Sequence, residues 1–265
     1  MSTSIQKFNV LPAIREYVKG IFLVENEDNI FGNGMNSIEP NGTVKLTLPL
    51  ENSVSGQYGL ERFLAREGQL TYVGMFERPF QIAGLEKKFT RLLVIELSPL
   101  GAYRLLKADQ QEHVNSFCVL KDCNGKFIRE LEEVLINEPN VDRKIFHLQH
   151  YFQKVFFASK DDVIFDYCVK QIQGKFGNIT IKELEKNTGY SSRWLNMKFK
   201  QQLGFSPKLY ASIVRFKTLL AHISIEKDRI MDDKIYLDYY YDQAHFIREF
   251  KRYSGMTPTE FFMPA

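Results

Sequence analysis

Cysteine is scarce in this sequence. Cys118, Cys123 and Cys168 make an odd number without the spacing of a disulfide framework. We therefore expect free thiols and a reducing compartment, the cytoplasm. Long apolar runs are also missing, because no stretch reaches the ~18 uninterrupted apolar residues of a membrane-spanning helix. The N-terminus has no basic segment followed by an apolar run, so we expect neither a signal peptide nor a membrane partner.

A strong charge of one sign is absent as well. The 265 residues include 35 lysines and arginines against 32 aspartates and glutamates, and the net charge of +3 alone indicates no partner. Residues 161–265 hold 16 basic and 13 acidic residues, whereas residues 1–160 hold 19 of each. A chain of this length is long enough for two domains. We expect the division to lie between residues 1–160 and 161–265.

Catalytic motifs are missing too. The sequence has no nucleophile elbow, phosphate-binding loop or dinucleotide fingerprint. The glycines at 32 and 34 lack a third glycine and a following helix, and they indicate a turn. His147 and His150, with Cys118 or Cys123 as further ligands, form a weak zinc pattern, and exposed or hydrogen-bonded histidines explain it more simply. We expect no enzyme, no catalytic residue, no metal site and no cofactor.

The N-terminal part is rich in short apolar runs separated by turn residues. The runs of strand length are Tyr17–Val24, Val44–Leu50, Leu70–Phe76 and Arg91–Leu97. Many short strands of this kind predict a small barrel or sandwich, although the pattern does not give the strand order.

The periodicity changes after residue 100. Gly101–Lys107, Phe127–Leu135 and Lys144–Phe157 have the apolar spacing of helices, and a helical part spans about residues 125–158. These helices link the two halves or form a dimer surface, and packing within one protomer explains them equally well. We therefore predict an α+β protein, in which a small β-rich, barrel-like domain with helices precedes an all-α domain.

The strongest signal is an internal repeat at an offset of 51 residues. Residues 190–210, YSSRWLNMKFKQQLGFSPKLY, align with residues 241–261, YDQAHFIREFKRYSGMTPTEF. Each copy has the pattern of an amphipathic helix, a terminating glycine and a second helix with proline at its first position. Leu195 and Phe199 align with Phe246 and Phe250, which predicts that these four side chains are buried. Trp194 is also assigned to packing, although it neighbours the exposed face.

The first copy has the pattern of a helix-turn-helix unit. Thr180 and Glu183 form a capping box before a short helix over 181–187, and Gly189 supplies a sharp turn. Residues 191–217 include six basic and no acidic residues, which suits phosphate contact better than an ordinary solvated face does. Two such helices on one rigid body can reach successive major grooves, roughly 34 Å apart. The pattern therefore favours DNA as the partner.

On these motifs, residues 161–265 closely resemble the AraC/XylS family of bacterial transcription regulators. The sequence Gly-Met-Thr-Pro at 255–258, after Arg-Glu-Phe-Lys-Arg at 248–252, is the most specific part. The resemblance implies about seven helices, with two helix-turn-helix units joined by a long helix over Pro207–Ile223. It also implies a cytoplasmic regulator that binds double-stranded promoter DNA and acts with RNA polymerase, more often as an activator.

The resemblance also implies site residues. The base contacts carried over from the family are Arg193, Asn196, Met197, Gln243, Ala244, Ile247 and Arg248. The phosphate contacts are Ser191, Ser192, Lys198, Lys200, Lys251 and Arg252. Arginine suits guanine, and asparagine or glutamine suits adenine, whereas phosphate contacts position the protein without reading sequence.

The sequence departs from the family pattern at two places. Met197 occupies a position where many relatives carry arginine. In the second unit, residues 233–242 are one residue short and lack the turn glycine, so a tyrosine there would be strained at positive φ. We expect the first helix of this unit to be short or tilted. The alternative function is a regulator that acts through protein contacts, with weakened DNA binding in the second unit.

The N-terminal part more faintly resembles the small β-rich sensor domains of such regulators. Residues 38–50, 73–82 and 95–106 carry this resemblance. It implies binding of a small-molecule effector, homodimerisation or both, and it names no ligand. DNA-repair alkyltransferases with a related domain need a zinc-bound cysteine cluster near the N-terminus, and the absence of cysteine before Cys118 argues against that activity.

Overall fold

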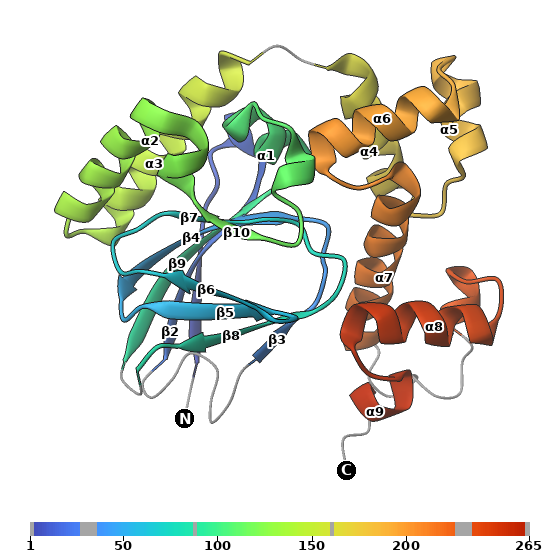
Figure 1. Ribbon diagram of the computed structural model, residues 1–265, viewed down its shortest axis with the longest axis horizontal. Coiled ribbons are helices and arrows are strands. Elements are labelled where there is room, and N and C mark those ends of the chain that lie inside the picture. The colour runs from blue at the N-terminus through green and yellow to red at the C-terminus, as the bar shows by residue number, and fades with distance from the viewer. Residues whose placement is uncertain (1–2, 27–35, 87–88, 160–161, 226–234, 263–265) are drawn as a thin grey trace.

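The computed structural model describes residues 3–26, 36–86, 89–159, 162–225 and 235–262 (Figure 1). Two antiparallel sheets precede a mainly helical region, and the predicted α+β fold class is confirmed. The turn expected at residues 32–34 lies outside the described residues. Among the helices of the described ranges, none has the length and apolar character needed to cross a membrane.

The β-rich part has ten strands in the described residues. They are β1 (Ser4–Phe8), β2 (Val18–Asn26), β3 (Asn36–Ile38), β4 (Val44–Glu51), β5 (Val54–Tyr58), β6 (Glu61–Ala65), β7 (Thr71–Val73), β8 (Phe80–Gly84), β9 (Thr90–Leu97) and β10 (Phe117–Val119). The larger sheet has the order β1-β2-β9-β4-β7-β10, and the smaller has the order β3-β8-β5-β6. Val54 and Ala65 of the smaller sheet pack with Leu92 of the larger, as expected for a barrel-like domain.

The strand predictions are accurate where the apolar run is long. β2, β4 and β9 lie within two residues of the predicted ends. The run over 70–76 forms a strand only at 71–73. Beyond the strand, the backbone of Gly74 and Met75 still bonds Ser116 and Asn115, the two residues that directly precede β10.

Three helices follow the sheets or lie against them. They are α1 (Pro99–Leu106), α2 (Leu120–Asn137) and α3 (Val141–Phe157), with the short 3-10 helices η1 (Pro12–Ile14) and η2 (Gln110–Glu112). α2 begins five residues before the predicted helical part. Gln149 of α3 is buried and bonds the backbone of Asn9 and Leu11 through its amide. α3 is thereby fixed to the start of the chain.

The C-terminal part is helical, as the repeat predicted. Its elements are α4 (Val163–Gly174), α5 (Ile181–Thr188), α6 (Ser192–Leu203), α7 (Pro207–Ile225), the 3-10 helix η4 (Ile235–Asp238), α8 (Gln243–Ser254) and α9 (Pro258–Phe262). α7 is the long helix that joins the two repeat copies (Figure 1). The predicted division at residue 160 falls between α3 and α4 and stays a prediction.

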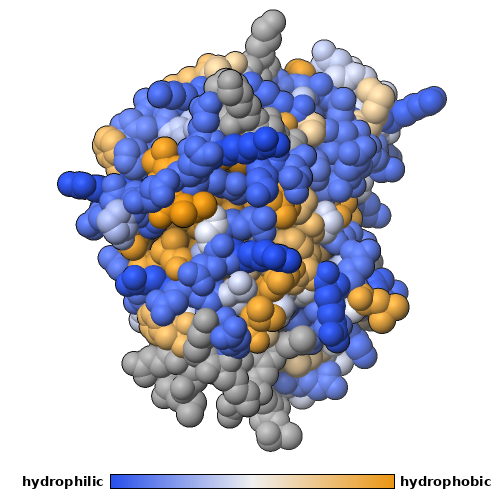
Figure 2. All heavy atoms as spheres, turned by 60° about the vertical axis from the view of Figure 1, so that its left-hand side comes forward, coloured by the Kyte–Doolittle hydropathy of each residue, from blue (hydrophilic) through white to orange (hydrophobic). Residues whose placement is uncertain are grey.

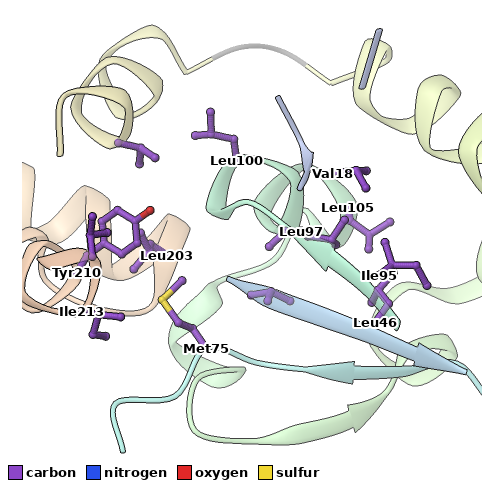
Figure 3. Packing of buried hydrophobic residues seen from close by; sticks show 14 of the residues in the cluster. Val18, Leu46, Met75, Ile95, Leu97, Leu100, Leu105, Leu203, Tyr210 and Ile213 are labelled. Atoms are coloured by element: carbon purple, nitrogen blue, oxygen red, sulfur yellow. The ribbon is translucent and has the colours of Figure 1, made fainter. Parts of the chain in front are cut away.

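One apolar cluster runs through both parts of the chain. It includes Leu46 and Ile95 of the larger sheet, Leu100 of α1, and Leu203 and Tyr210 of the helical part. Figure 3 shows Leu46 and Ile95 beside the strands at one side of the view, and Leu203 and Tyr210 in the α6–α7 region at the other. The N-terminal and C-terminal parts therefore bury apolar surface against each other, which is the main favourable contribution to such contacts.

A buried ion pair lies at this interface. Nη2 of Arg104 on α1 is 2.7 Å from Oδ2 of Asp166 on α4, and the Arg104 side chain is only 4% exposed. The guanidinium also lies 4.5 Å from the ring centroid of Tyr17. Because a buried charge is costly without its counter-ion, this pair makes the docking of α4 on α1 sensitive to either partner.

We predict that Asp166→Asn lowers the free energy of unfolding by about 3 kcal/mol, since it leaves the Arg104 guanidinium buried without its carboxylate. Chemical denaturation measures this loss. The matched control is Glu16→Gln, which removes the exposed pair between Glu16 and Lys170, whose side chains are 41% and 56% exposed. The control should cost less than about 1 kcal/mol. Equal losses in the free energy of unfolding would show that the buried pair stabilises the fold no more than the exposed pair does.

Candidate nucleic-acid interface and ligand cavity

Helices α6 and α8 have the same local construction. Each has twelve residues. Ser191 and Asp242 cap them, each accepting a hydrogen bond from the backbone N–H three residues on, which satisfies an otherwise unpaired donor. Gly204 and Gly255 end them at φ +89° and +80°, a region that favours glycine. The structure therefore confirms that the two repeat copies share their helix length, caps and terminating glycine.

The predicted packing face of each helix is buried. Leu195 and Phe199 are 1% and 0% exposed, and Phe246 and Phe250 are 8% and 0% exposed. Trp194 is half-buried and stacks on Tyr190, with ring centroids 4.1 Å apart. These contacts fix the orientation of α6 and α8, so that their opposite faces are presented outward.

The structure brings the three predicted base contacts of α6 together. Arg193 and Met197 are exposed, and Asn196 is half-buried with its Nδ2 donating to the Ser192 carbonyl at 2.8 Å. These three residues line one surface hollow with Lys200 and with Gln111 of η2. Gln111 was missed by sequence reasoning, because it is 82 positions before Arg193 and belongs to no motif.

The predicted base contacts of α8 are exposed on its first two turns. They are Gln243, Ala244, Ile247 and Arg248. Positions three and four residues apart in this set share one side of a helix. The set can therefore meet a partner as one surface.

Four of the predicted phosphate contacts are already engaged within the protein. Ser191 serves as the α6 cap, and the Ser192 backbone N–H donates to Glu185. Lys198 lies 2.5 Å from Asp162, whose pKa is lowered by hydrogen bonds from Lys198, Gln202 and the backbone.

Arg252 pairs with Glu77 of the N-terminal part at 2.7 Å. Lys200 and Lys251 are exposed. These two lysines are therefore the predicted phosphate contacts that are most accessible.

The turn before α6 follows the predicted geometry. The capping box of Thr180 and Glu183 is formed in both directions, and hydrogen bonds from Thr180 lower the pKa of Glu183 to about 2. Gly189 has φ +75°, and a side chain there would meet open space. Backbone conformation alone therefore requires the glycine.

The turn before α8 has a different structure. Among the described residues before this helix, no tyrosine has positive φ, so the expected strain is absent. The chain passes from η4 to an extended Asp242 at φ −148° without a left-handed residue. Tyr240 is buried beside this turn, where it is 3% exposed. The Arg215 guanidinium lies 5.0 Å from the centroid of its ring. Arg215 also pairs with Glu249 at 2.8 Å, so this member of the basic run supports packing.

Metal-binding groups do not converge in the described part of the chain, where no three His, Cys, Asp or Glu side chains gather. His147 and His150 are exposed on α3, and Cys118 lies on β10 with its sulfur 3.9 Å from His113 Nδ1. The weak zinc pattern of the sequence therefore has Cys118 and the two α3 histidines on separate elements.

A cavity of about 370 Å³ lies between the two sheets. Its walls are almost entirely apolar; they include Ile5, Val24, Ile38, Val54, Phe63, Val73, Phe80, Ile82, Leu92, Val94 and Phe117. Lys45 is the cationic residue of the wall, and its Nζ lies 3.3 Å from Asn41 Oδ1. Burial lowers the pKa of Lys45; nearby Glu96 opposes this effect, and Lys217 adds to it.

Comparison with known proteins identifies a domain type and a shared fold. Residues 184–263 match a family model described as a helix-turn-helix domain. No curated protein matches the chain. A structure of ToxT from Vibrio cholerae bound to (E)-4-(8-methylnaphthalen-1-yl)but-3-enoic acid has a TM-score of 0.51 at 14% identity, over 91% of this chain and 98% of that one.

Two further ToxT structures from Vibrio cholerae are similar to 91% of this chain. A 1.65 Å structure has a TM-score of 0.49 at 14% identity over 97% of its chain. A structure with bound unsaturated fatty acid has a TM-score of 0.49 at 13% identity over 94% of its chain. At these identities, the ToxT structure with a TM-score of 0.51 shows a shared fold.

We predict opposite effects of alanine at two glycines that both face open space. Gly189→Ala should lower the free energy of unfolding by about 1–2 kcal/mol, because alanine must adopt positive φ. Gly174→Ala, within α4 and with no neighbour within 4 Å, should raise it by about 0.5–1 kcal/mol through helix propensity. Thermal denaturation compares the two. A neutral or stabilising Gly189 variant would show that the turn does not need this conformation.

Proposed function

Because residues 184–263 form an AraC-type helix-turn-helix domain, we propose that the protein is a sequence-specific DNA-binding regulator of transcription that responds to an effector. The observation that carries the proposal is the pair of twelve-residue helices, α6 and α8, with equivalent caps and exposed first turns. A helix fits the major groove, where each base pair has a distinct pattern of donors and acceptors. Two helices on one body allow two successive grooves to be read.

In this proposal α6 reads bases through Arg193, Asn196 and Met197. The arginine suits guanine, the asparagine suits adenine, and the apolar methionine suits a thymine methyl group. Gln243 and Arg248 offer comparable donors on α8. Lys200 and Lys251 supply phosphate contact, which adds affinity without sequence preference.

The proposed effector is an amphipathic carboxylic acid that occupies the cavity between the sheets. The apolar wall suits a hydrocarbon body, and Lys45 suits a carboxylate. The compound bound in the ToxT structure that shares this fold, (E)-4-(8-methylnaphthalen-1-yl)but-3-enoic acid, belongs to this class.

A homodimer is the proposed active form, with the face of α2 and α3 as its contact surface. Val134, Ile136, Phe146 and Phe157 are 43%, 56%, 56% and 60% exposed there. Figure 2, which turns this side of the molecule forward, shows apolar patches among charged side chains. Exposed patches of this kind are typical of protein contacts. Binding of two copies at a promoter in the bacterial cytoplasm would let the protein recruit RNA polymerase as an activator.

The alternative function is a regulator that acts mainly through protein contacts. One observation favours it, because the second unit enters α8 through the short η4, and its Arg252 is paired with Glu77. DNA affinity that falls steeply with salt distinguishes the two functions, since counterion release is expected only for a DNA binder.

We predict that purified protein enriches a short motif from genomic fragments. Arg193→Ala should weaken binding to that motif by about 1–3 kcal/mol and relax the preference at one position, because a bidentate base contact is lost. Gln243→Ala should act at a second half-site. Quantitative sequencing of the bound fragments measures both effects, and sedimentation of the complexes reports whether two protomers bind.

The matched control is Arg66→Ala, an exposed arginine between β6 and β7. This variant should enrich the same motif with the same preference. If wild-type protein enriches no motif at low salt, with or without effector, the protein-contact function becomes the better explanation.

We also predict that Lys45→Met weakens binding of oleate, as a representative fatty acid, by roughly 10- to 100-fold, through loss of about 1.5–3 kcal/mol from a charged hydrogen bond. Wild-type affinity should fall as the pH rises through the lowered Lys45 pKa, because a neutral amine must take up a proton on binding. Titration calorimetry measures both effects, and Lys182→Met on α5 is the control. An affinity independent of Lys45 would place the carboxylate elsewhere.

A further inference from the structure

Two loops of the N-terminal part are bonded to each other beside the helical part. Residues 74–79 and 109–116, here named the paired loops, share three hydrogen bonds. The Gly74 N–H donates to Ser116 O at 3.0 Å, and the Asn115 N–H donates to Met75 O at 2.9 Å. The Glu77 N–H donates to Asn115 Oδ1 at 2.9 Å. A Cβ on Gly74 would lie 1.8 Å from the His113 carbonyl oxygen, so the close approach requires glycine.

The paired loops contact the end of α6. A Cβ on Gly204 would lie 2.8 Å from the Gln110 carbonyl oxygen and 2.1 Å from Val114 Cγ1. Met75 is 3% exposed, and Figure 3 shows it next to Leu203. Gln111 shares the surface hollow of the predicted base contacts. The paired loops therefore contact the first helix-turn-helix unit at the end of α6, and they border its predicted base contacts.

The same loops contact the end of α8. Glu77 pairs with Arg252 at 2.7 Å, and Pro79 Cγ would lie 3.5 Å from a Cβ on Gly255. Gly204 and Gly255 are equivalent positions of the 51-residue repeat. One bonded pair of loops thus touches the equivalent turn in both helix-turn-helix units.

The charges of the paired loops oppose a nucleic acid. Glu77 forms an ion pair with Arg252, a predicted phosphate contact. Asp109 accepts a hydrogen bond from Gln111 Nε2 at 3.3 Å, and both Asp109 and Glu112 are exposed. DNA phosphates that approach α6 would come near the carboxylates of Asp109 and Glu112, and these negative charges would repel each other.

The ends of the paired loops coincide with the wall of the cavity. Val73 directly precedes residues 74–79, Phe80 directly follows them, and Phe117 directly follows residues 109–116. All three side chains line the cavity. A ligand that moves these side chains therefore acts on the paired loops without any intermediate element.

We propose that the paired loops hold both helix-turn-helix units in a state of lower DNA affinity, and that Glu77 must release Arg252 before this arginine reaches a phosphate. The proposal rests on the proposed DNA-binding function and names how that function is regulated. Glu77 is thereby a positioning residue of the DNA-binding surface, supplied by the N-terminal part of the chain.

Fluorescence anisotropy with the full chain and its enriched DNA motif tests this proposal. Glu77→Gln keeps the shape of the side chain and removes the ion pair, so it should tighten binding about two- to fivefold, the range expected for a partly exposed pair. Arg252→Ala should weaken binding, and it should abolish the gain when combined with Glu77→Gln. Glu77→Lys should tighten binding further than Glu77→Gln.

The matched controls are Glu61→Gln and Glu61→Lys, at an exposed position on the same side of the molecule that forms no ion pair with described residues. They should change affinity much less than the Glu77 variants. If wild-type protein binds the motif and Glu77→Gln binds equally or more weakly, the proposal is overturned while the proposed function stands. If neither protein binds any DNA, both fail. Thermal denaturation confirms that each variant is folded.

Discussion

The close contact at Gly204 is the constraint on which the arrangement of this molecule depends. At φ +89° this residue ends α6, and its missing side chain leaves room for the Gln110 carbonyl and Val114. Any larger residue would both strain the turn and push the N-terminal part away. The apolar cluster and the buried pair of Arg104 and Asp166 join the same two parts of the chain. The direction of α6 is therefore set by two parts of the chain at once.

The helical part could be predicted closely from the sequence because its signals are local. Caps, prolines and terminating glycines act within a few residues, and the repeat shows each of them twice. α6 and α8 consequently each end at the glycine that the repeat predicts. The turn before α8 was the exception. Its geometry depends on Tyr240 packing under Arg215, and a contact between α7 and a distant tyrosine leaves no local pattern.

The site could be predicted as a set of exposed positions, but not with its partners. Arg252 and Glu77 are 175 residues apart, and no periodicity connects such pairs. Lys45 could not be predicted for a different reason, because its local pattern indicates another environment. Alternation along β4 places Lys45 opposite the buried Val44 and Leu46, which is typical of a solvent-facing side chain. Because a second sheet covers that face, the same alternation lines a cavity instead.

An apolar cavity of this size favours occupancy on physical grounds. Its walls lose packing contacts when it is empty, and any ligand that fills it stabilises the folded barrel by mass action. Three side chains of the wall, Val73, Phe80 and Phe117, adjoin the paired loops, which contact both helix-turn-helix units. A ligand that displaces these side chains therefore acts on that contact. A ligand can shift that contact only by fitting one arrangement of the wall better than another. In the proposed regulation, shape at these three side chains, more than affinity for the barrel as a whole, therefore decides which apolar acid acts on the paired loops.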